Sequence, residues 1–425
     1  MVGIRVLAVL LSSSVAASAA AAVTFNKDIL PILQHRCQEC HRPGSIGPMP
    51  LLTYAQARPW ARSIRESVLT RKMPPWFADP RFGHFANDRS LSKSEIDAIA
   101  AWAEAGAPEG DPKDRPPDRE WPHDWQIGPP DAVFEMPEPF QLARSGAIEY
   151  QYIILPTRFT EDKWVQRIEV RPSARDSVHH AVVYIREPGS AWLRDRPLGK
   201  AFSLGSTPDH RPNPLSFTKS DILLVYTPGN SVDGWPVGMA KRIPAGSDIV
   251  LQMHYTAGGK SKEDRTRIGL VFAREKPAKA VYTLQMSNDR FVIPPGDPDY
   301  MAEVSGTLPN DALLLSLFPH MHLRGKGFEY MIAEPGGRVE MLLKVNHYDF
   351  NWQLNYRLAE PRPLRAGTRL VFYGYFDNSP NNPQNPDPTA EVRFGEQSWE
   401  EMMIGFFDVA VDSRLSKADF FVRKK

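Results

Sequence analysis

The sequence predicts a multidomain protein in which a small all-α domain is followed by two all-β, jelly-roll-like sandwich domains. Helix-capping patterns and helical periodicity are confined to the first part of the 425-residue chain. Short alternating strand patterns separated by Pro and Gly fill the rest. The 40 prolines are about twice the average usage, which favours a loop-rich β protein. We expect a signal peptide over 1–22, domains over 23–110, 140–279 and 280–425, and a Pro-rich linker over 111–139.

The first residues have the pattern of a secretory signal. Arg5 provides a positive start, Val6–Leu11 form a short apolar core, and Ser12–Ala22 are mainly small residues suited to cleavage. No later apolar stretch is long enough to predict a membrane span. Lys and Arg (51) nearly balance Asp and Glu (50), so no basic face indicates a nucleic-acid partner. We expect a periplasmic or secreted protein.

Three helix starts are predicted near the N-terminus. Asn26 can cap a short helix that leads toward the first cysteine. Thr53 with Gln56, and Ser92 with Glu95, have the spacing of capping boxes before apolar-periodic segments. These elements predict the small all-α domain.

The two cysteines of the chain lie in a C-x-x-C-H motif. Cys37, Cys40 and His41 have the spacing that attaches haem covalently, with both thiols in thioether bonds and the imidazole as an axial ligand to iron. The alternatives are a redox-active cysteine pair or half of a zinc site. A zinc site needs further ligands at characteristic spacing, and the chain has no other cysteine.

Helices around a C-x-x-C-H site resemble a small class I cytochrome c. The resemblance implies a second axial ligand, normally a Met, which raises the haem potential. Met73 is favoured because the prolines that follow it stiffen its loop. Met49 is the alternative thioether ligand, and His84 is the fallback.

The remainder of the chain has strand periodicity. The turn-and-strand segment 245–250 resembles 366–371, which indicates two related sandwiches divided near residue 280. The following runs are strand-like: 148–154, 181–185, 222–226, 249–253, 268–273, 313–318 and 370–376.

Five histidines in this region have spacings typical of metal ligands. His320 and His322 are two apart, so on a strand both side chains would point to one face. His179 and His180 are adjacent, so shared ligation would require a bulge or kink. His254 is near the end of a third predicted strand. Imidazole-rich sites with few carboxylates suit copper or zinc, and a Met ligand favours copper.

The order His-His, Gln-x-His-Tyr, His-x-His and Glu-x-Met over about residues 140–425 resembles the type II copper, ascorbate-dependent monooxygenases. That family includes the peptidylglycine hydroxylating and dopamine β-monooxygenases, and its two sandwich domains each hold one copper. The resemblance implies an electron-transfer copper and a catalytic, oxygen-activating copper. Their respective ligands would be His179, His180 and His254, and His320, His322 and Met402.

The resemblance also implies a function and a set of partners. We expect an exported monooxygenase that hydroxylates an organic substrate with dioxygen and receives electrons through its own haem, itself reduced by an external donor. Phe318, Ile404 and Phe406 replace polar residues of the peptidylglycine enzyme, which indicates a weakly polar small-molecule substrate. The alternatives are a non-catalytic haem and copper protein for electron transfer or oxygen sensing, and a module whose histidines hold structural zinc.

Overall fold

The computed structural model describes residues 22–122, 124–205, 221–259, 262–415 and 423–424. Residues 1–21 of the expected signal peptide therefore lie outside the described residues. Among the described residues, no helix combines the length and apolar character needed to cross a bilayer. The described residues fall into two compact units: a helical unit of 22–42, Met49–Met73 and Leu91–Asp118, and a β unit of Pro43–Pro48, Pro74–Ser90 and the described residues from Arg119 onward.

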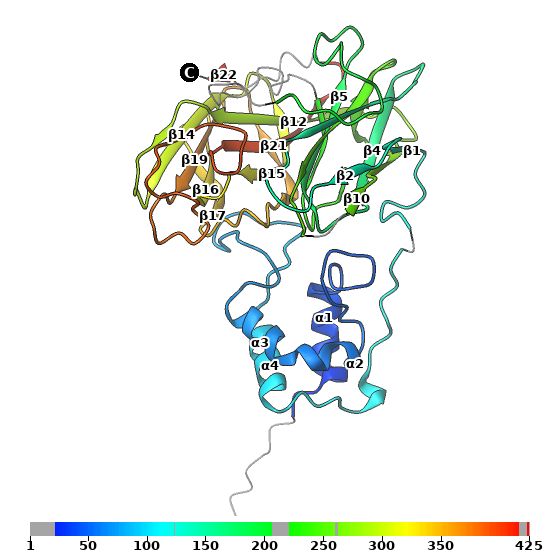
Figure 1. Cartoon of the computed structure of the whole chain (residues 1–425), viewed down its shortest axis with the longest axis vertical. Helices are drawn as coiled ribbons and strands as arrows, with labels where there is room; N and C mark the ends of the chain where they lie inside the picture. The colour runs from blue at the N-terminus through cyan, green and yellow to red at the C-terminus, as the bar shows by residue number, and fades with distance from the viewer. Residues whose placement is uncertain (1–21, 123, 206–220, 260–261, 416–422, 425) are drawn as a thin grey trace, which may run out of the picture. The chain divides into compact units, whose positions relative to one another are not determined.

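Short helices around a small apolar core form the helical unit (Figure 1). Ser92 caps α4 in a complete capping box with Glu95, as its sequence predicts. Thr53 accepts a hydrogen bond from the backbone N–H of Gln56 at the start of α2. The helices are η1 (Phe25–Ile29), α1 (Leu30–Arg36), α2 (Tyr54–Ala57), η2 (Arg58–Trp60), α3 (Ala61–Leu69), α4 (Lys93–Glu104) and η3 (Pro112–Asp114).

Asn26 does not cap a helix, contrary to the sequence prediction. Thr24 occupies the N-cap position of η1, and Asn26 lies inside that π-helical turn. The Asn26 side-chain amide instead donates to the carbonyls of Gly110 and Asp111, at 3.4 and 3.3 Å. The Asn26 side chain, predicted to cap a helix, thus connects the beginning of the helical unit to its end through hydrogen bonds.

The predicted fold class requires two corrections, and the first concerns its all-α domain. The described part of the chain is mostly β, with 38% strand and 11% helix. The α-helices α1 to α4 are only 7, 4, 9 and 12 residues long. Much of the segment 23–110 is irregular, and Pro74–Ser90 belongs to the β unit. This segment therefore does not form a substantial all-α cytochrome domain.

Strands of the β unit form where the alternation predicts them, as in β9 and β15, whose side chains are largely buried. The strands are β1 (Ala132–Glu135), β2 (Phe140–Leu142), β3 (Gln151–Pro156), β4 (Lys163–Arg171), β5 (Val178–Arg186), β6 (Asp221–Tyr226), β7 (Val232–Gly234), β8 (Met239–Ile243), β9 (Asp248–Tyr255), β10 (Lys262–Asp264), β11 (Arg267–Phe272), β12 (Lys279–Asn288), β13 (Val292–Ile293), β14 (Tyr300–Thr307), β15 (Ala312–His320), β16 (Gly325–Ala333), β17 (Val339–Val345), β18 (Tyr356–Leu364), β19 (Arg369–Phe376), β20 (Val392–Arg393), β21 (Met403–Asp412) and β22 (Arg423–Lys424).

Three main sheets make up the β unit. A nine-stranded sheet has the order β1-β11-β4-β8-β12-β21-β15-β18, with β7 paired to β4. A four-stranded sheet, β3-β9-β5-β6, contributes to one apolar core together with β4, β8 and β11. A five-stranded sheet, β17-β16-β19-β14-β22, contributes to the other core together with β12, β15 and β21 (Figure 1). We call β1–β11 the first half and β12–β22 the second half.

The second correction concerns the two sandwich domains, which are not separate. The nine-stranded sheet continues from one half into the other through a parallel pairing, in which Lys279 and Ala280 of β12 lie opposite Met239 and Ala240 of β8. Val281 of the second half is also buried in the core of the first. Both halves therefore form one compact unit that shares a sheet.

The segment 74–90 packs on the second half of the β unit. Ala78 forms a bridge with Val345 of β17, and Phe85 forms one with Leu358 of β18. The rings of Trp76 and Phe85 lie 4.9 and 5.5 Å from the ring of Tyr356. This segment therefore extends two strand edges of the β unit, although it was expected in the preceding domain.

Candidate metal centre

An extra residue in β5 brings His179 and His180 to one place. Across β5 and β9, Val178 pairs with Tyr255 and His180 pairs with His254, so His179 is the additional residue of a β-bulge. A bulge breaks the alternation of side chains, which allows adjacent residues to approach one point. The sequence predicted that shared ligation would require this irregularity.

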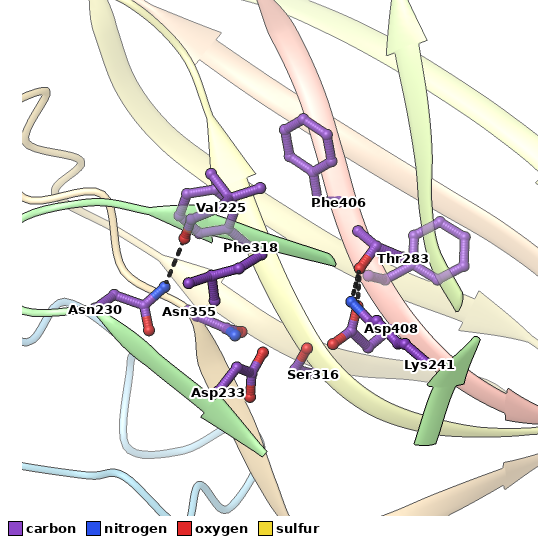
Figure 2. Close-up of a pocket in the computed structure, with 12 residues that line it drawn as sticks. Val225, Asn230, Asp233, Lys241, Thr283, Ser316, Phe318, Asn355, Phe406 and Asp408 are labelled. Atoms are coloured by element: carbon purple, nitrogen blue, oxygen red, sulfur yellow. Dashed lines mark hydrogen bonds and ion pairs between the residues drawn. The ribbon is translucent and has the colours of Figure 1, made fainter. Parts of the chain in front are cut away.

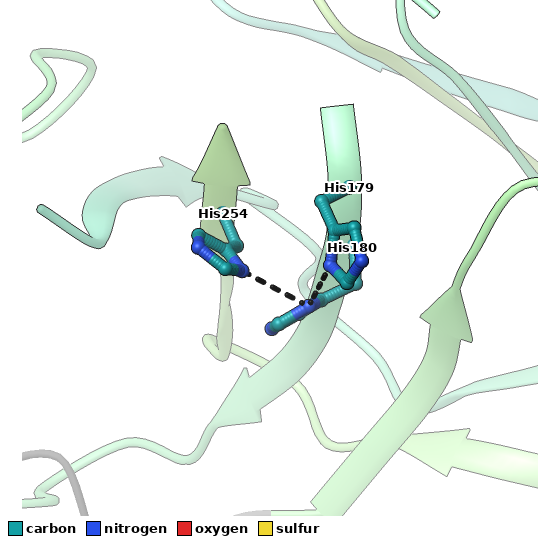
Figure 3. Close-up of side chains that lie close together, drawn as sticks. All are labelled: His179, His180 and His254. Carbon is teal, nitrogen blue, oxygen red and sulfur yellow. Dashed lines mark hydrogen bonds between the residues drawn. The ribbon is translucent and has the colours of Figure 1, made fainter. Parts of the chain in front are cut away.

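Three Nδ1 atoms converge at the bulge (Figure 3). The His180 Nδ1 lies 3.2 Å from the His179 Nδ1 and 3.4 Å from the His254 Nδ1. Two imidazole nitrogens bound at about 2.0–2.1 Å to one tetrahedral ion would be about 3.3 Å apart. One proton on His180 could bridge only one of its two neighbours, whereas a metal ion would accept a lone pair from all three. The triad can therefore offer three lone pairs to a transition-metal ion, with its ligand atoms all within 4.8 Å of one another.

Burial keeps these imidazoles neutral, the form that binds metals. It lowers the pKa of His179 to about 4 and that of His254 to about 3, with nearby imidazoles adding to the effect. The pKa of His180 is lowered well below its ordinary value, again by burial first and then by the neighbouring histidines. No deprotonation is thus needed before an ion binds at neutral pH.

His320 and His322 form a second group at the end of β15. Their ring centroids lie 5.3 Å apart, and both side chains are buried. Burial lowers the pKa of both, to about 4 for His320. His322 donates Nδ1–H to the carbonyl of Glu400 at 3.3 Å, and His320 donates Nδ1–H to the side chain of Gln353 at 2.6 Å. Each therefore has its Nε2 lone pair free for a ligand.

Met402, the predicted thioether ligand, lies on the segment that holds His322. The buried carboxylate of Glu401 accepts from the backbone N–H of His322 at 2.8 Å and from that of Met402 at 3.2 Å. The Met402 side chain packs with Phe318 and with Phe406, whose ring lies 6.4 Å from that of His320. Glu401 thus brings the two chain segments together.

The two histidine groups lie next to each other. The His180 and His320 ring centroids are 5.8 Å apart, although these residues come from different halves of the β unit. The Phe350 ring stacks on His179 at 4.3 Å and lies 6.0 Å from His322. The structure therefore gathers all five predicted histidines into one cluster, in which Phe350 contacts His179 and His322.

Sequence reasoning missed the residues that orient these imidazoles. The carbonyl of Phe350 accepts the Nε2–H of His179 at 3.2 Å, and the side chain of Gln353 accepts the Nδ1–H of His320. No motif marks either residue, because every residue type offers a backbone carbonyl and because Gln353 reaches His320 only through the fold of the chain. Tyr150, whose ring lies 4.8 Å from His254, was also missed.

The C-x-x-C-H residues lie in the helical unit just after α1. Burial, followed by the nearby Cys40, raises the pKa of Cys37 to about 12. His41 donates Nδ1–H to the carbonyl of Met49 at 3.1 Å, which leaves its Nε2 for a metal. The fallback ligand His84 belongs to the β unit, where its carbonyl accepts from Ala359.

A small pocket beside Phe318 and Phe406 has both apolar and charged residues in its lining (Figure 2). Its volume is about 20 Å³, enough for about one water molecule. Lys241, Asp233 and Asp408 line it opposite the two aromatic rings. The predicted third residue, Ile404, packs with Phe318 and Phe406 but does not line the pocket.

Comparisons with known proteins provide no family for the chain. No protein-family model matches it. No curated protein matches it either. Matching solved structures include the major capsid protein P2 from bacteriophage PM2, with 11% identity, coverage of 67% of this chain and 98% of that chain, and a TM-score of 0.28. The STIV MCP matches with 10% identity, 67% and 99% coverage and a TM-score of 0.29. PNGF-II matches with 9% identity, 67% and 66% coverage and a TM-score of 0.31. TM-scores this low assign neither a family nor a function.

The predicted family is withdrawn, because no family model and no curated protein supports either sequence resemblance. The matched structures named above are capsid proteins and PNGF-II, and at these TM-scores they carry no argument for a function. The predicted monooxygenase and oxidoreductase activity is corrected accordingly. The alternative of a haem and copper electron-transfer or oxygen-sensing protein is withdrawn as well. The expected partners and the expected export stay predictions.

Proposed function

We propose that the β unit binds transition-metal ions and that it prefers copper. The convergence of three Nδ1 atoms from His179, His180 and His254, at 3.2 and 3.4 Å, carries this proposal. Neutral, buried imidazoles bind copper and zinc well, and a thioether such as Met402 adds preference for Cu(I). His320, His322 and Met402 are the ligands proposed for a second ion.

The chemistry of the site follows from its own residues. The three imidazoles supply lone pairs without releasing protons, because burial already keeps them neutral. Phe350 and Gln353 fix which nitrogen of His179 and of His320 faces the centre. A bound copper ion would supply a positive charge that compensates three inward-facing lone pairs.

Metal titration of the full chain tests the proposal. Copper and zinc would each be titrated against a competing chelator, and bound metal would be counted per chain. His180→Ala should lower copper affinity at the triad by at least about 100-fold, since it removes the nitrogen that lies between the other two. His347→Ala is the matched control, because His347 is exposed on the same unit. Equal copper binding by wild type and His180→Ala would overturn the proposal.

A second proposal, covalent haem attachment at Cys37 and Cys40, is favoured by the hydrogen bond from His41 to Met49. That bond leaves the Nε2 of His41 as the nitrogen that would hold the iron of an attached haem, so the motif and the hydrogen bond agree. Haem staining of the chain, made in cells that mature c-type haem and separated under denaturing conditions, tests attachment. Cys37→Ala/Cys40→Ala should lose the stained band, and a wild-type chain without it would overturn the proposal.

A further inference from the structure

We propose that Gln353 is a positioning residue that makes metal binding interdependent at the two imidazole groups. The first group is His179, His180 and His254, and the second group is His320 and His322. This inference rests on the proposed metal binding and concerns how the two groups influence each other.

One amide and one carbonyl connect an imidazole of each group. The Gln353 Oε1 accepts the Nδ1–H of His320 at 2.6 Å, and its Nε2 donates to the carbonyl of Phe350 at 3.3 Å. The same carbonyl accepts the Nε2–H of His179 at 3.2 Å. Gln353 is only 2% exposed, so water does not compete effectively for these bonds. The chain of bonds runs from His320 through Gln353 and Phe350 to His179.

The chain of bonds determines which lone pairs face the centre. His320 gives its Nδ1 proton to the amide oxygen, so its Nε2 is the free ligand atom. His179 gives its Nε2 proton to Phe350, so its Nδ1 is the free ligand atom. The amide orientation is fixed by its two different partners, an imidazole N–H donor and a carbonyl acceptor.

The turn that carries Gln353 is also held by the first half of the β unit. The hydroxyl of Thr227, just after β6, donates to the backbone carbonyl of Gln353 at 2.6 Å. Ordering His320 by metal therefore orders a turn whose Phe350 carbonyl orients His179. A ligand that stabilises one group should raise affinity at the other, and the effect is reciprocal by thermodynamic linkage.

Two Gln353 variants separate the two bonds of the amide. Gln353→Leu removes both, and we expect copper affinity at both groups to fall by about 10- to 100-fold, although no ligand is changed. Gln353→Glu retains an acceptor for His320 but no donor for Phe350, so affinity should be preserved better at the second group than at the first. Gln285→Leu, which changes an exposed glutamine of β12, is the control and should bind copper as wild type does.

Affinity at each group is read from chains in which the other group is disabled. His322→Ala leaves the first group and keeps the bond between His320 and Gln353, His180→Ala leaves the second group, and copper is titrated against a chelator in each background. Cu(II) electron paramagnetic resonance reports whether the coordinating nitrogens change, which a purely structural loss of stability would not produce. In a His320→Ala background, Gln353→Leu should weaken the first group less than in the His322→Ala background, because the connection between Gln353 and residue 320 is then already broken.

The outcomes distinguish the two proposals. Wild type that binds neither copper nor zinc overturns the proposed function and this inference together. Wild type that binds two ions, with both affinities unchanged in Gln353→Leu, overturns the inference alone. The inference is also overturned if Gln353→Leu lowers copper affinity only at the second group, because Gln353 would then not influence His179 through Phe350. Should Gln353→Leu fail to fold by thermal melting, the near-isosteric Gln353→Glu decides the question.

Discussion

Lys241 lies on β8, where the first half of the nine-stranded sheet passes into the second, and 4% of its side chain is exposed. Its ammonium donates to the carbonyls of Ile222 and Leu223 at 3.0 and 3.1 Å and to the hydroxyl of Thr283 at 2.6 Å. It also lies 3.7 Å from the carboxylate of Asp408 (Figure 2). Lys241→Met keeps most of the aliphatic stem and removes all four interactions.

The cost of this change can be worked from the geometry. Two unit charges at the 3.7 Å separation interact by about 4 kcal/mol at an effective dielectric constant of about 20. Removing one partner of a buried pair leaves the other charge uncompensated and typically costs about 3–5 kcal/mol. The Asp408 side chain is 7% exposed, so water cannot replace the ammonium. We therefore expect Lys241→Met to lower the free energy of unfolding by about 3–5 kcal/mol.

Urea unfolding at neutral pH, followed by tryptophan fluorescence, measures this loss. Lys241→Met/Asp408→Leu should recover much of it, because replacing both charges by apolar groups removes the unpaired carboxylate. Lys200→Met is the control, since the Lys200–Glu138 pair is exposed and should be worth less than about 1 kcal/mol. A Lys241→Met protein within about 1 kcal/mol of wild type would refute the reasoning.

Burial and the neighbouring Asp408 charge raise the pKa of Asp233 from 3.8 to about 6. The stability that this proton contributes is complete below pH 3.8 and is lost as pH rises through about 6. In the wild type this should lower the free energy of unfolding by up to about 3 kcal/mol between pH 4 and pH 7, as measured by urea unfolding. Asp233→Asn should remove that loss. An Asp233→Asn protein whose free energy of unfolding depends on pH as in the wild type would contradict this reasoning. Gly405→Ala on β21 would place a methyl group against the Phe372 ring and should cost about 1–3 kcal/mol in the same assay. Ser92→Ala removes the capping box of α4 and should cost about 1 kcal/mol, read from faster amide exchange in α4; unaltered exchange would show that the cap is not needed.

Local pattern was sufficient to find several of the longer strands and all five clustered histidines. Alternation located β9 and β15, and the adjacency of His179 and His180 predicted an irregularity that β5 contains. Each of these inferences needed only a few consecutive residues, because strand geometry has a fixed period.

Non-local pairing was not predictable in this way. The parallel pairing of β8 with β12 crosses the expected domain boundary near residue 280. The sequence of neither strand indicates which strand it pairs with. The segment 74–90 has the composition of a loop, so its attachment to β17 and β18 could not be read from sequence. The proximity of His180 to His320 depends on the same long-range packing.

The bulge in β5 gives the proposed centre a simple origin. Val178 and His180 already face Tyr255 and His254 as consecutive residues of a regular ladder would, and His179 is the single residue in excess. Deleting His179 would therefore leave a better-paired strand with two imidazoles instead of three. One inserted residue in an otherwise regular strand pair is thus what adds the third imidazole to this group. Metal binding at this group and the folding of the sheet therefore depend on different residues. We expect a chain that lacks His179 to fold but to bind less metal at this group.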